Sequence, residues 1–174
     1  MACVQGGKYL GAKVIGVSTS REKLAKLAAL GLDAGICARG TDFSSEVLAA
    51  NGGKGVDLAV NLIGGTTFAA CQKSLADFGR LAVVGYVDGA MNANIDLEAV
   101  HGKRLQIFGI SNSQLTLAAR AEATRGFNRD FLPGLAGGAI TPVIDRVFPF
   151  AELPAAKAHV EAGAHLGKVI IRVD

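Results

Sequence analysis

The sequence lacks the features that would place the chain in a membrane or on a nucleic acid. None of its apolar runs approaches the roughly 18 residues that cross a bilayer, and the N-terminus has no basic segment followed by an apolar stretch and a cleavage site. Its 18 Lys and Arg residues are scattered among 15 acidic ones, and a net charge of +3 is small for 174 residues. We therefore expect a cytoplasmic protein that binds neither membranes nor nucleic acids.

Cysteine and histidine are also scarce. Cys3, Cys37 and Cys71 are odd in number, far apart and surrounded by small apolar residues, which predicts reduced core thiols rather than disulfides or a metal site. The three histidines have no zinc-ligand spacing, and His159 is expected to be half-buried packing on a helix. No Ser–His–Asp set or carboxylate pair stands at the predicted strand ends. The sequence thus predicts no catalytic residue and no metal site.

Short apolar runs alternate with longer amphipathic runs, a pattern typical of a parallel sheet covered by helices. The segment Thr19–Glu22 has the form of a capping box that opens a helix, and LAVNL is predicted to be a fully buried strand. Five strands of one doubly wound sheet are predicted at Lys13–Val17, Ala34–Cys37, Leu58–Leu62, Arg80–Val84 and Leu105–Ile110.

The last part of the chain has a different pattern. Gly137-Gly138 marks a loose joint, and a strand (Val143–Phe148), a helix (Ala151–Ala162) and a last strand (Lys168–Val173) follow it. We therefore predict a main domain over residues 1–141 and a strand–helix–strand segment over residues 142–174.

Five stretches in register carry a family resemblance: LGAKVIGVSTSREKLAKLAALG, GGKGVDLAVNLIGG, SLADFGRLAVVG, ITPVIDRVFPFAELPAAKAHV and HLGKVIIRVD. They resemble the cofactor-binding half of the medium-chain dehydrogenase/reductase superfamily, and within it zinc-independent NADPH:quinone oxidoreductases and related enoyl reductases. The resemblance implies a Rossmann-like, doubly wound α/β sheet. It also implies that this sequence lacks the usual first strand, the glycine-rich turn and a separate substrate domain. That turn forms the main diphosphate cradle of a dinucleotide fold.

Polar residues follow the first two predicted strands. Where folds that prefer NAD carry an acidic residue, this sequence has Ser18. Hydrogen-bond donors and cations suited to a 2′-phosphate surround it, as the resembling enzymes have them; the predicted NADP(H) residues are Ser18, Thr19, Arg21, Lys23 and Arg39. An ordinary polar helix start is the alternative. Ala38 departs from the family pattern, which often has an aromatic residue at this position.

A second group follows the third and fourth predicted strands. The segment NLIGGT is a strand end, a diglycine turn and a helix start, so it offers bare N–H groups to an anion. The resemblance implies that these loops line the nicotinamide, and Asn61, Gly64 and Gly85 are the predicted contacts. The alternative is that the glycines only tighten turns.

Two functions of different classes follow. The chain is either the NADPH-binding module of a quinone-oxidoreductase-like reductase, active only when another chain supplies the substrate domain, or a nonenzymatic relic or interaction protein. In both cases we expect a homodimer through the edge strand Leu105–Ile110, which has few charges to protect it and which the resembling enzymes use for dimerisation.

The missing strand would be the central one, so the strands VIGV and LAVNL would face a gap of about 10 Å. Unpaired backbone groups on both sides would be too costly to leave open. The sequence leaves three alternatives. The strand KVIIRV fills the gap, from its own chain or from a partner; the flanking strands pair directly; or the first helix is disordered.

Overall fold

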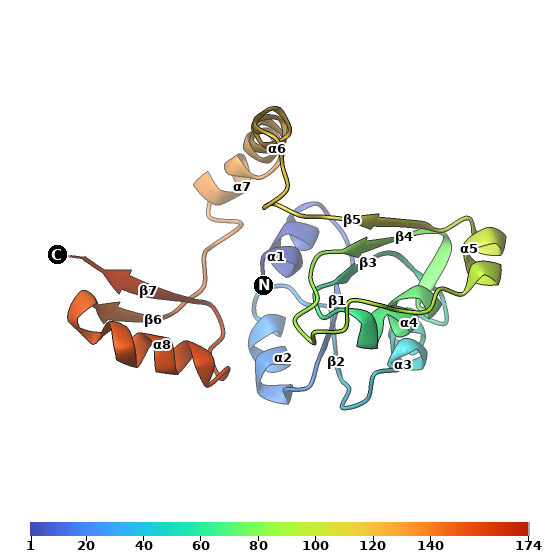
Figure 1. The fold of residues 1–174 in the computed structure, drawn as a ribbon, viewed down its shortest axis with the longest axis horizontal. Coiled ribbons are helices and arrows are strands. Elements are labelled where there is room, and N and C mark those ends of the chain that lie inside the picture. Colours follow the sequence, from blue (N-terminus) through green and yellow to red (C-terminus); the bar gives the residue numbers. More distant parts are fainter. Residues whose placement is uncertain (174) are drawn as a thin grey trace.

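The computed structural model describes residues 1–173 as an alternating series of helices and parallel strands (Figure 1). The helices are α1 Ala2–Tyr9, α2 Arg21–Ala28, α3 Ser44–Ala50, α4 Gly65–Lys73, α5 Leu97–Lys103, α6 Leu117–Asp130, α7 Leu132–Ala136 and α8 Leu153–Glu161, with a 3₁₀ turn at Phe150–Glu152. The strands are β1 Ile15–Ser18, β2 Ala34–Cys37, β3 Val56–Asn61, β4 Leu75–Val83, β5 Gln106–Gly109, β6 Ile144–Pro149 and β7 Lys168–Arg172. No helix in this range is long and apolar enough to cross a membrane.

Helices cover both faces of the strands in the main body. Val14, just before β1, and Cys37 of β2 pack toward Val4 of α1 and Leu24 of α2. The neighbouring Ile15 packs toward the helices of the opposite face. Because successive side chains of a strand point to opposite faces, this alternation shows two helical layers. The prediction of a doubly wound, Rossmann-like α/β fold is confirmed.

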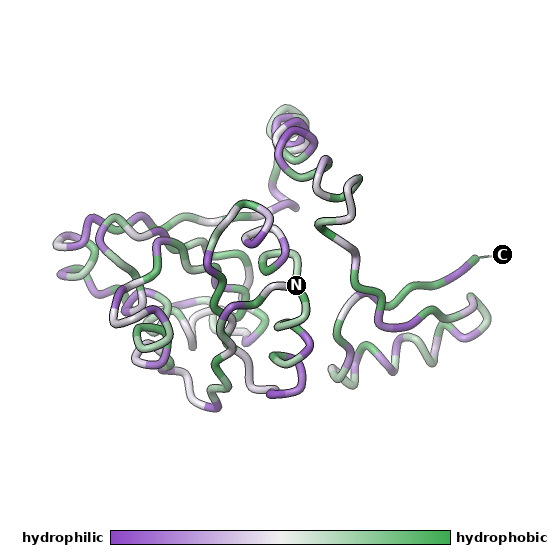
Figure 2. The backbone as a smooth tube through the Cα atoms, turned by 180° about the vertical axis from the view of Figure 1, so that it is seen from behind, coloured by the Kyte–Doolittle hydropathy of each residue, from purple (hydrophilic) through white to green (hydrophobic). Residues whose placement is uncertain are grey.

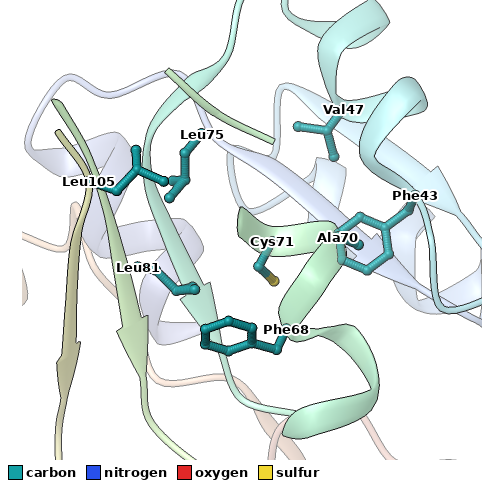
Figure 3. Packing of buried hydrophobic residues seen from close by; sticks show 8 residues of the cluster. All are labelled: Phe43, Val47, Phe68, Ala70, Cys71, Leu75, Leu81 and Leu105. Carbon is teal, nitrogen blue, oxygen red and sulfur yellow. The ribbon is translucent and has the colours of Figure 1, made fainter. Parts of the chain in front are cut away.

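The larger core lies between α3, α4 and β4. Leu75 and Leu81 of β4 are 0% exposed, and Figure 3 shows Phe68 and Cys71 of α4 beside Leu81. Burial of Cys71 raises the pKa of its thiol to about 11, as expected when the charged thiolate is desolvated. Cys3, predicted to be a core thiol, is instead exposed.

The prediction of one five-stranded sheet is wrong in its central pairing. β1 pairs only with β2, and β3, β4 and β5 form a separate parallel ladder. Among residues 1–173 no strand lies between β1 and β3, and no ladder joins them. Figure 1 shows β1 and β3 as the facing edges of the two ladders.

None of the predicted closures occurs within residues 1–173. The KVIIRV strand is β7, which pairs in parallel with β6 rather than with β1 or β3. Direct pairing of the flanking strands is absent from the described residues, and α1 is a formed helix. LAVNL is also not fully buried, because Leu58 is 45% and Val60 38% exposed. Supply of a strand by a partner chain stays a prediction.

The C-terminal segment builds its own small unit. β6 and β7 form a two-stranded parallel sheet against α8, and Figure 2 shows hydrophobic residues along much of β7. Gln5 of α1 exchanges two hydrogen bonds with the backbone of Thr141, at 2.9 and 2.8 Å. The division of the chain at residues 141 and 142 stays a prediction.

Several element boundaries differ from the predicted ones for local reasons. Ser20, not Thr19, is the N-cap of α2, because its side chain accepts a hydrogen bond from the Lys23 N–H at 3.2 Å. β4 begins at Leu75, before the predicted start at Arg80, and it includes an irregular stretch where Phe78 has φ 60° and the β3–β4 register shifts.

Candidate functional site

The carboxyl ends of β1 and β2 bring the first predicted group together. Ser18 lies opposite Cys37 in the parallel ladder, and the Ala38 N–H donates to the Ser18 carbonyl at 3.1 Å. Arg39 therefore emerges beside the loop from Ser18 to Arg21. Both Arg21 and Arg39 are exposed, and within residues 1–173 neither guanidinium has an ion pair or hydrogen bond. Two uncompensated cations thus lie at one edge of the sheet.

The Ser18 hydroxyl and the Lys23 ammonium group near these cations already have hydrogen-bond partners within the chain. The Ser18 hydroxyl accepts a hydrogen bond from the Ser20 N–H at 3.2 Å, which tightens the strand-to-helix connection. Lys23 Nζ donates to the Gly163 carbonyl at 2.6 Å, in the loop between α8 and β7. Arg21 and Arg39 are therefore freer than Lys23 to meet an anion.

The second predicted group forms a tight turn after β3. Asn61 is 2% exposed, and its amide donates to the Gly64 carbonyl at 2.9 Å. The Asn61 Oδ1 atom accepts from the N–H groups of Ile63 and Gly64 at 2.9 and 3.0 Å. Gly64 has φ 132° and ψ −150°, a conformation that only glycine adopts readily. Both ends of the Asn61 amide are engaged in holding this turn.

The first two N–H groups of α4, predicted from NLIGGT to be bare, are already hydrogen-bonded within the chain. The Gly65 N–H donates to the Ala90 carbonyl at 2.8 Å. Thr66 donates to Asp88 Oδ2 from its N–H at 3.0 Å and from its hydroxyl at 2.6 Å. These bonds lower the pKa of Asp88, the hydroxyl bond most. The chain's own carboxylate therefore occupies this helix terminus.

Sequence reasoning missed the role of Asp88. The Asp-Gly pair at Asp88-Gly89 is a common turn dipeptide and predicts only a turn. The spacing of the residues does not reveal the contact between Asp88 and Thr66, which are 22 residues apart. The contact fixes the loop that follows β4 against the start of α4.

A small pocket lies between this loop and the β3–α4 turn. Its volume is about 190 Å³, below the roughly 300 Å³ at which typical ligand sites begin. Gly64 and Gly85 line it together with Phe68, Tyr86 and Met91. A ring-sized group fits this space, whereas a whole dinucleotide does not.

Two further arrangements bear on chemistry. His159 Nε2 lies 2.7 Å from Asp145 Oδ2, and the His159 ring packs against Phe148. This pair belongs to the C-terminal unit and lies on α8 and β6. In the part of the chain that the structure describes, no cluster of His, Cys, Asp or Glu could hold a metal ion.

Comparison with known proteins gives several similarities. The chain is 27% identical over 180 residues to a highly reducing polyketide synthase of Emericella nidulans, covering 99% of this chain and 7% of that protein. A solved mycobacterial quinone oxidoreductase is 25% identical, with a TM-score of 0.78 over 95% of this chain and 50% of that one. A solved NAD-dependent alcohol dehydrogenase is 27% identical, with a TM-score of 0.79 over 99% of this chain and 47% of that one.

This chain therefore spans about half of those two solved chains and a small part of the synthase. The family described as zinc-binding dehydrogenase matches residues 1–127. That match covers α1 to β5 and most of α6, including both groups of predicted site residues. The chain belongs to the zinc-binding dehydrogenase family, as a cofactor domain of the medium-chain dehydrogenase/reductase superfamily.

Proposed function

We propose that the chain is the NADP(H)-binding module of a reductase similar to quinone oxidoreductases, acting without zinc. The observation that carries the proposal is the pair of uncompensated guanidinium groups, Arg21 and Arg39, beside Ser18 at the carboxyl ends of β1 and β2. A carboxylate at the Ser18 position would repel a 2′-phosphate, whereas a hydroxyl and two guanidinium groups favour it.

The residues present fit a nicotinamide nucleotide at its two ends. Arg21 and Arg39, with Ser18 and Thr19, would hold the phosphate-bearing ribose, and Lys23 would join them on releasing Gly163. The turn of Asn61, Gly64 and Gly85 would border the nicotinamide ring, given the ring-sized pocket. A bound nicotinamide supplies the hydride, and the protein orients it against a substrate.

The start of α4 is not free to hold the diphosphate between these ends, because the Gly65 N–H donates to the Ala90 carbonyl and Thr66 donates to Asp88. Each charge-assisted hydrogen bond that is not made forgoes about 1.5–3 kcal/mol. We therefore expect binding of about millimolar affinity for the chain alone.

Hydride transfer requires a substrate domain that holds the substrate against the nicotinamide. We propose that another chain or domain supplies it. The polyketide synthase and the quinone oxidoreductase suggest enones or quinones as the substrate class. The second candidate is an interaction protein that keeps the fold without turnover, which the closed start of α4 favours. We also propose a cytoplasmic location.

Calorimetry with NADP(H) and NAD(H) tests the cofactor assignment. We expect tighter binding of NADP(H), and loss of that preference in Arg21→Ala. Lys54→Ala removes the same charge just before β3, at the opposite end of the sheet, and is the matched control. Equal affinities of the wild-type chain for NADP(H) and NAD(H) would contradict the assignment of NADP(H) as the cofactor.

A separate assay distinguishes the two candidate functions. NADPH oxidation with quinones or enones is followed for the chain alone and with the products of neighbouring genes. Turnover that depends on a second protein supports the reductase. Nucleotide binding without turnover in every combination supports the interaction protein.

A further inference from the structure

Lys23 connects the proposed phosphate site to the C-terminal unit, which consists of β6, α8 and β7 over residues 144–172. Its side chain is half-buried, and its Nζ atom donates to the Gly163 carbonyl at 2.6 Å, across 140 residues of sequence. Figures 1 and 2 show the C-terminal unit beside α2, the helix that carries Lys23. One ammonium group therefore joins two parts of the molecule.

The Gly163 carbonyl lies where a cation is favoured, just beyond the end of α8. Ala162 is the C-cap of this helix. Gly163 follows it with φ 68°, and its N–H donates to the Val160 carbonyl at 3.0 Å. The end of a helix has free carbonyl groups and a partial negative charge, which a cation stabilises. Lys23 supplies this cation from a different helix.

A second attraction between α2 and the C-terminal unit is also polar. The hydrogen bond to Glu22 raises the pKa of Lys26 most, and the Asp145 carboxylate of β6 raises it further. The two core clusters that the structure describes draw their residues from positions 4–107, outside the C-terminal unit. Parts of a chain that meet without a large apolar interface are expected to move relative to one another. The contact with α2 is therefore one that a ligand can break.

The loop that carries Gly163 is also held from within the C-terminal unit. The Leu166 N–H donates to Asp145 Oδ1 at 2.9 Å, and His159 Nε2 lies 2.7 Å from Asp145 Oδ2. Neither interaction involves Lys23. Loss of the Lys23 bond would therefore release the loop from α2 and leave the C-terminal unit folded.

A phosphate group at the carboxyl ends of β1 and β2 would compete with Gly163 for Lys23. Arg21 is the first residue of α2, and Lys23 lies in the same first turn. A phosphate accepts charge-assisted hydrogen bonds, which are stronger than a hydrogen bond to a neutral carbonyl. The phosphate should therefore draw Lys23 away from Gly163.

We propose that Lys23 exchanges partners: a 2′-phosphate bound at Arg21 and Arg39 takes Lys23 from Gly163 and so releases the C-terminal unit from α2. This inference rests on the proposed NADP(H) function. Because coupling between two binding events is reciprocal, the contact with Gly163 lowers the affinity for the 2′-phosphate. NAD(H), which has no 2′-phosphate, leaves the contact in place.

The NMR chemical shift of the Gly163 carbonyl carbon tests the proposal, because it responds to hydrogen bonds that the carbonyl accepts. The chain of residues 1–174 is titrated with adenosine 2′,5′-bisphosphate, or with adenosine 5′-monophosphate, which lacks the 2′-phosphate. We expect the bisphosphate to move the Gly163 shift to its value in Lys23→Ala and to leave the shift of that variant unchanged. The monophosphate should leave the Gly163 shift of the wild type in place.

Nitrogen relaxation in the same samples reports the release itself. The amides of β6 and β7 should tumble with the main body in the wild type and faster than it once the bisphosphate is bound. Lys23→Ala should show the faster tumbling without ligand. Lys54→Ala, which removes a lysine just before β3, is the matched control and should change neither the Gly163 shift nor the tumbling.

The affinities for the bisphosphate give a further measure of the exchange. Arg21→Ala loses a cation that has no other partner and should weaken binding about tenfold. Lys23→Ala should weaken binding only about threefold or less, because the wild type gives up the bond to Gly163 to make the bond to phosphate. Equal losses in the two variants would contradict the exchange.

Three outcomes overturn the proposal. If the bisphosphate moves the amide signals of Arg21 and Arg39 while Gly163 and the tumbling stay unchanged, the phosphate site stands and the coupling fails. If the bisphosphate moves no signal, the phosphate site fails, and the coupling fails with it. If the Gly163 shift is the same in the wild type and in Lys23→Ala, the contact between Lys23 and Gly163 is absent in solution.

Discussion

Replacing Gly64 by alanine tests whether the turn after β3 is built around glycine. At φ 132° and ψ −150°, a residue with a side chain costs about 1–3 kcal/mol in backbone strain. The new Cβ would also lie 2.1 Å from Asp88 Oδ1 and 2.9 Å from the Tyr86 Cα. Forcing an atom into filled space adds about 1–3 kcal/mol, so we expect a total loss of about 2–6 kcal/mol in the free energy of unfolding.

Gly89→Ala is the matched control for this variant. Gly89 also has a positive φ, of 74°, but no atom lies within 4 Å of its Cβ position. Only the left-handed backbone penalises alanine there, by about 1–2 kcal/mol. Both variants therefore place alanine at a positive φ, and only Gly64→Ala adds a clash with the loop after β4.

Urea unfolding followed by circular dichroism measures both losses. A lower midpoint with an unchanged slope reports a true stability change. Equal losses in Gly64→Ala and Gly89→Ala would refute the reasoning, because the contact between Gly64 and Asp88 would then carry no weight. The double variant Gly64→Ala, Asp88→Ala should lose less than the sum of the losses in the two single variants, since removing the carboxylate clears the nearest clash.

Three other predictions concern the core, the thiols and the free edge. Leu81→Ala, at a side chain that is 0% exposed, should cost about 2–5 kcal/mol in urea unfolding, and a loss below 1 kcal/mol would contradict the assigned core. A thiol reagent followed by mass spectrometry should label exposed Cys3 quickly and Cys71 only on unfolding, because burial raises the Cys71 pKa to about 11; equal rates would contradict this. Light scattering should give a dimer for the wild type and a monomer for Phe108→Lys, on β5, where Phe108 is 40% exposed; a wild-type monomer at high micromolar concentration would count against dimerisation.

The sequence predicts the elements of this fold well where local signals are strong. The strand at Ala34–Cys37 is correct to the residue, because its apolar residues are bounded by turn residues. The observed N-cap of α2, Ser20, lies one residue after the predicted N-cap, Thr19. Both side chains can cap a helix, and only the hydrogen bond from the Lys23 N–H to Ser20 decides between them. Strand identity follows from composition, whereas a boundary depends on one side-chain bond.

Long-range contacts could not be predicted from the sequence. The burial of LAVNL was overestimated because an apolar run of this kind is buried only when strands flank it on both sides, and β3 has one neighbour among the strands that the structure describes. The Asp88 contact with Thr66 joins residues from different loops, and no periodicity encodes it. Parallel pairing of β1 with β2 brings the strand ends before Arg21 and Arg39 to one edge of the sheet, and their role in cofactor binding stays a prediction.

The two groups of predicted site residues lie on different ladders. Arg21 and Arg39 follow β1 and β2, whereas Asn61 and Gly85 follow β3 and β4. Because no ladder joins β1 to β3 among residues 1–173, a nucleotide held at both ends must cross from the carboxyl ends of one ladder to those of the other. A ligand that binds both ladders stabilises both against opening. NADP(H) should therefore slow amide hydrogen exchange in β1 and in β3 together, and slowing confined to one ladder would show that only one of the two groups holds the nucleotide.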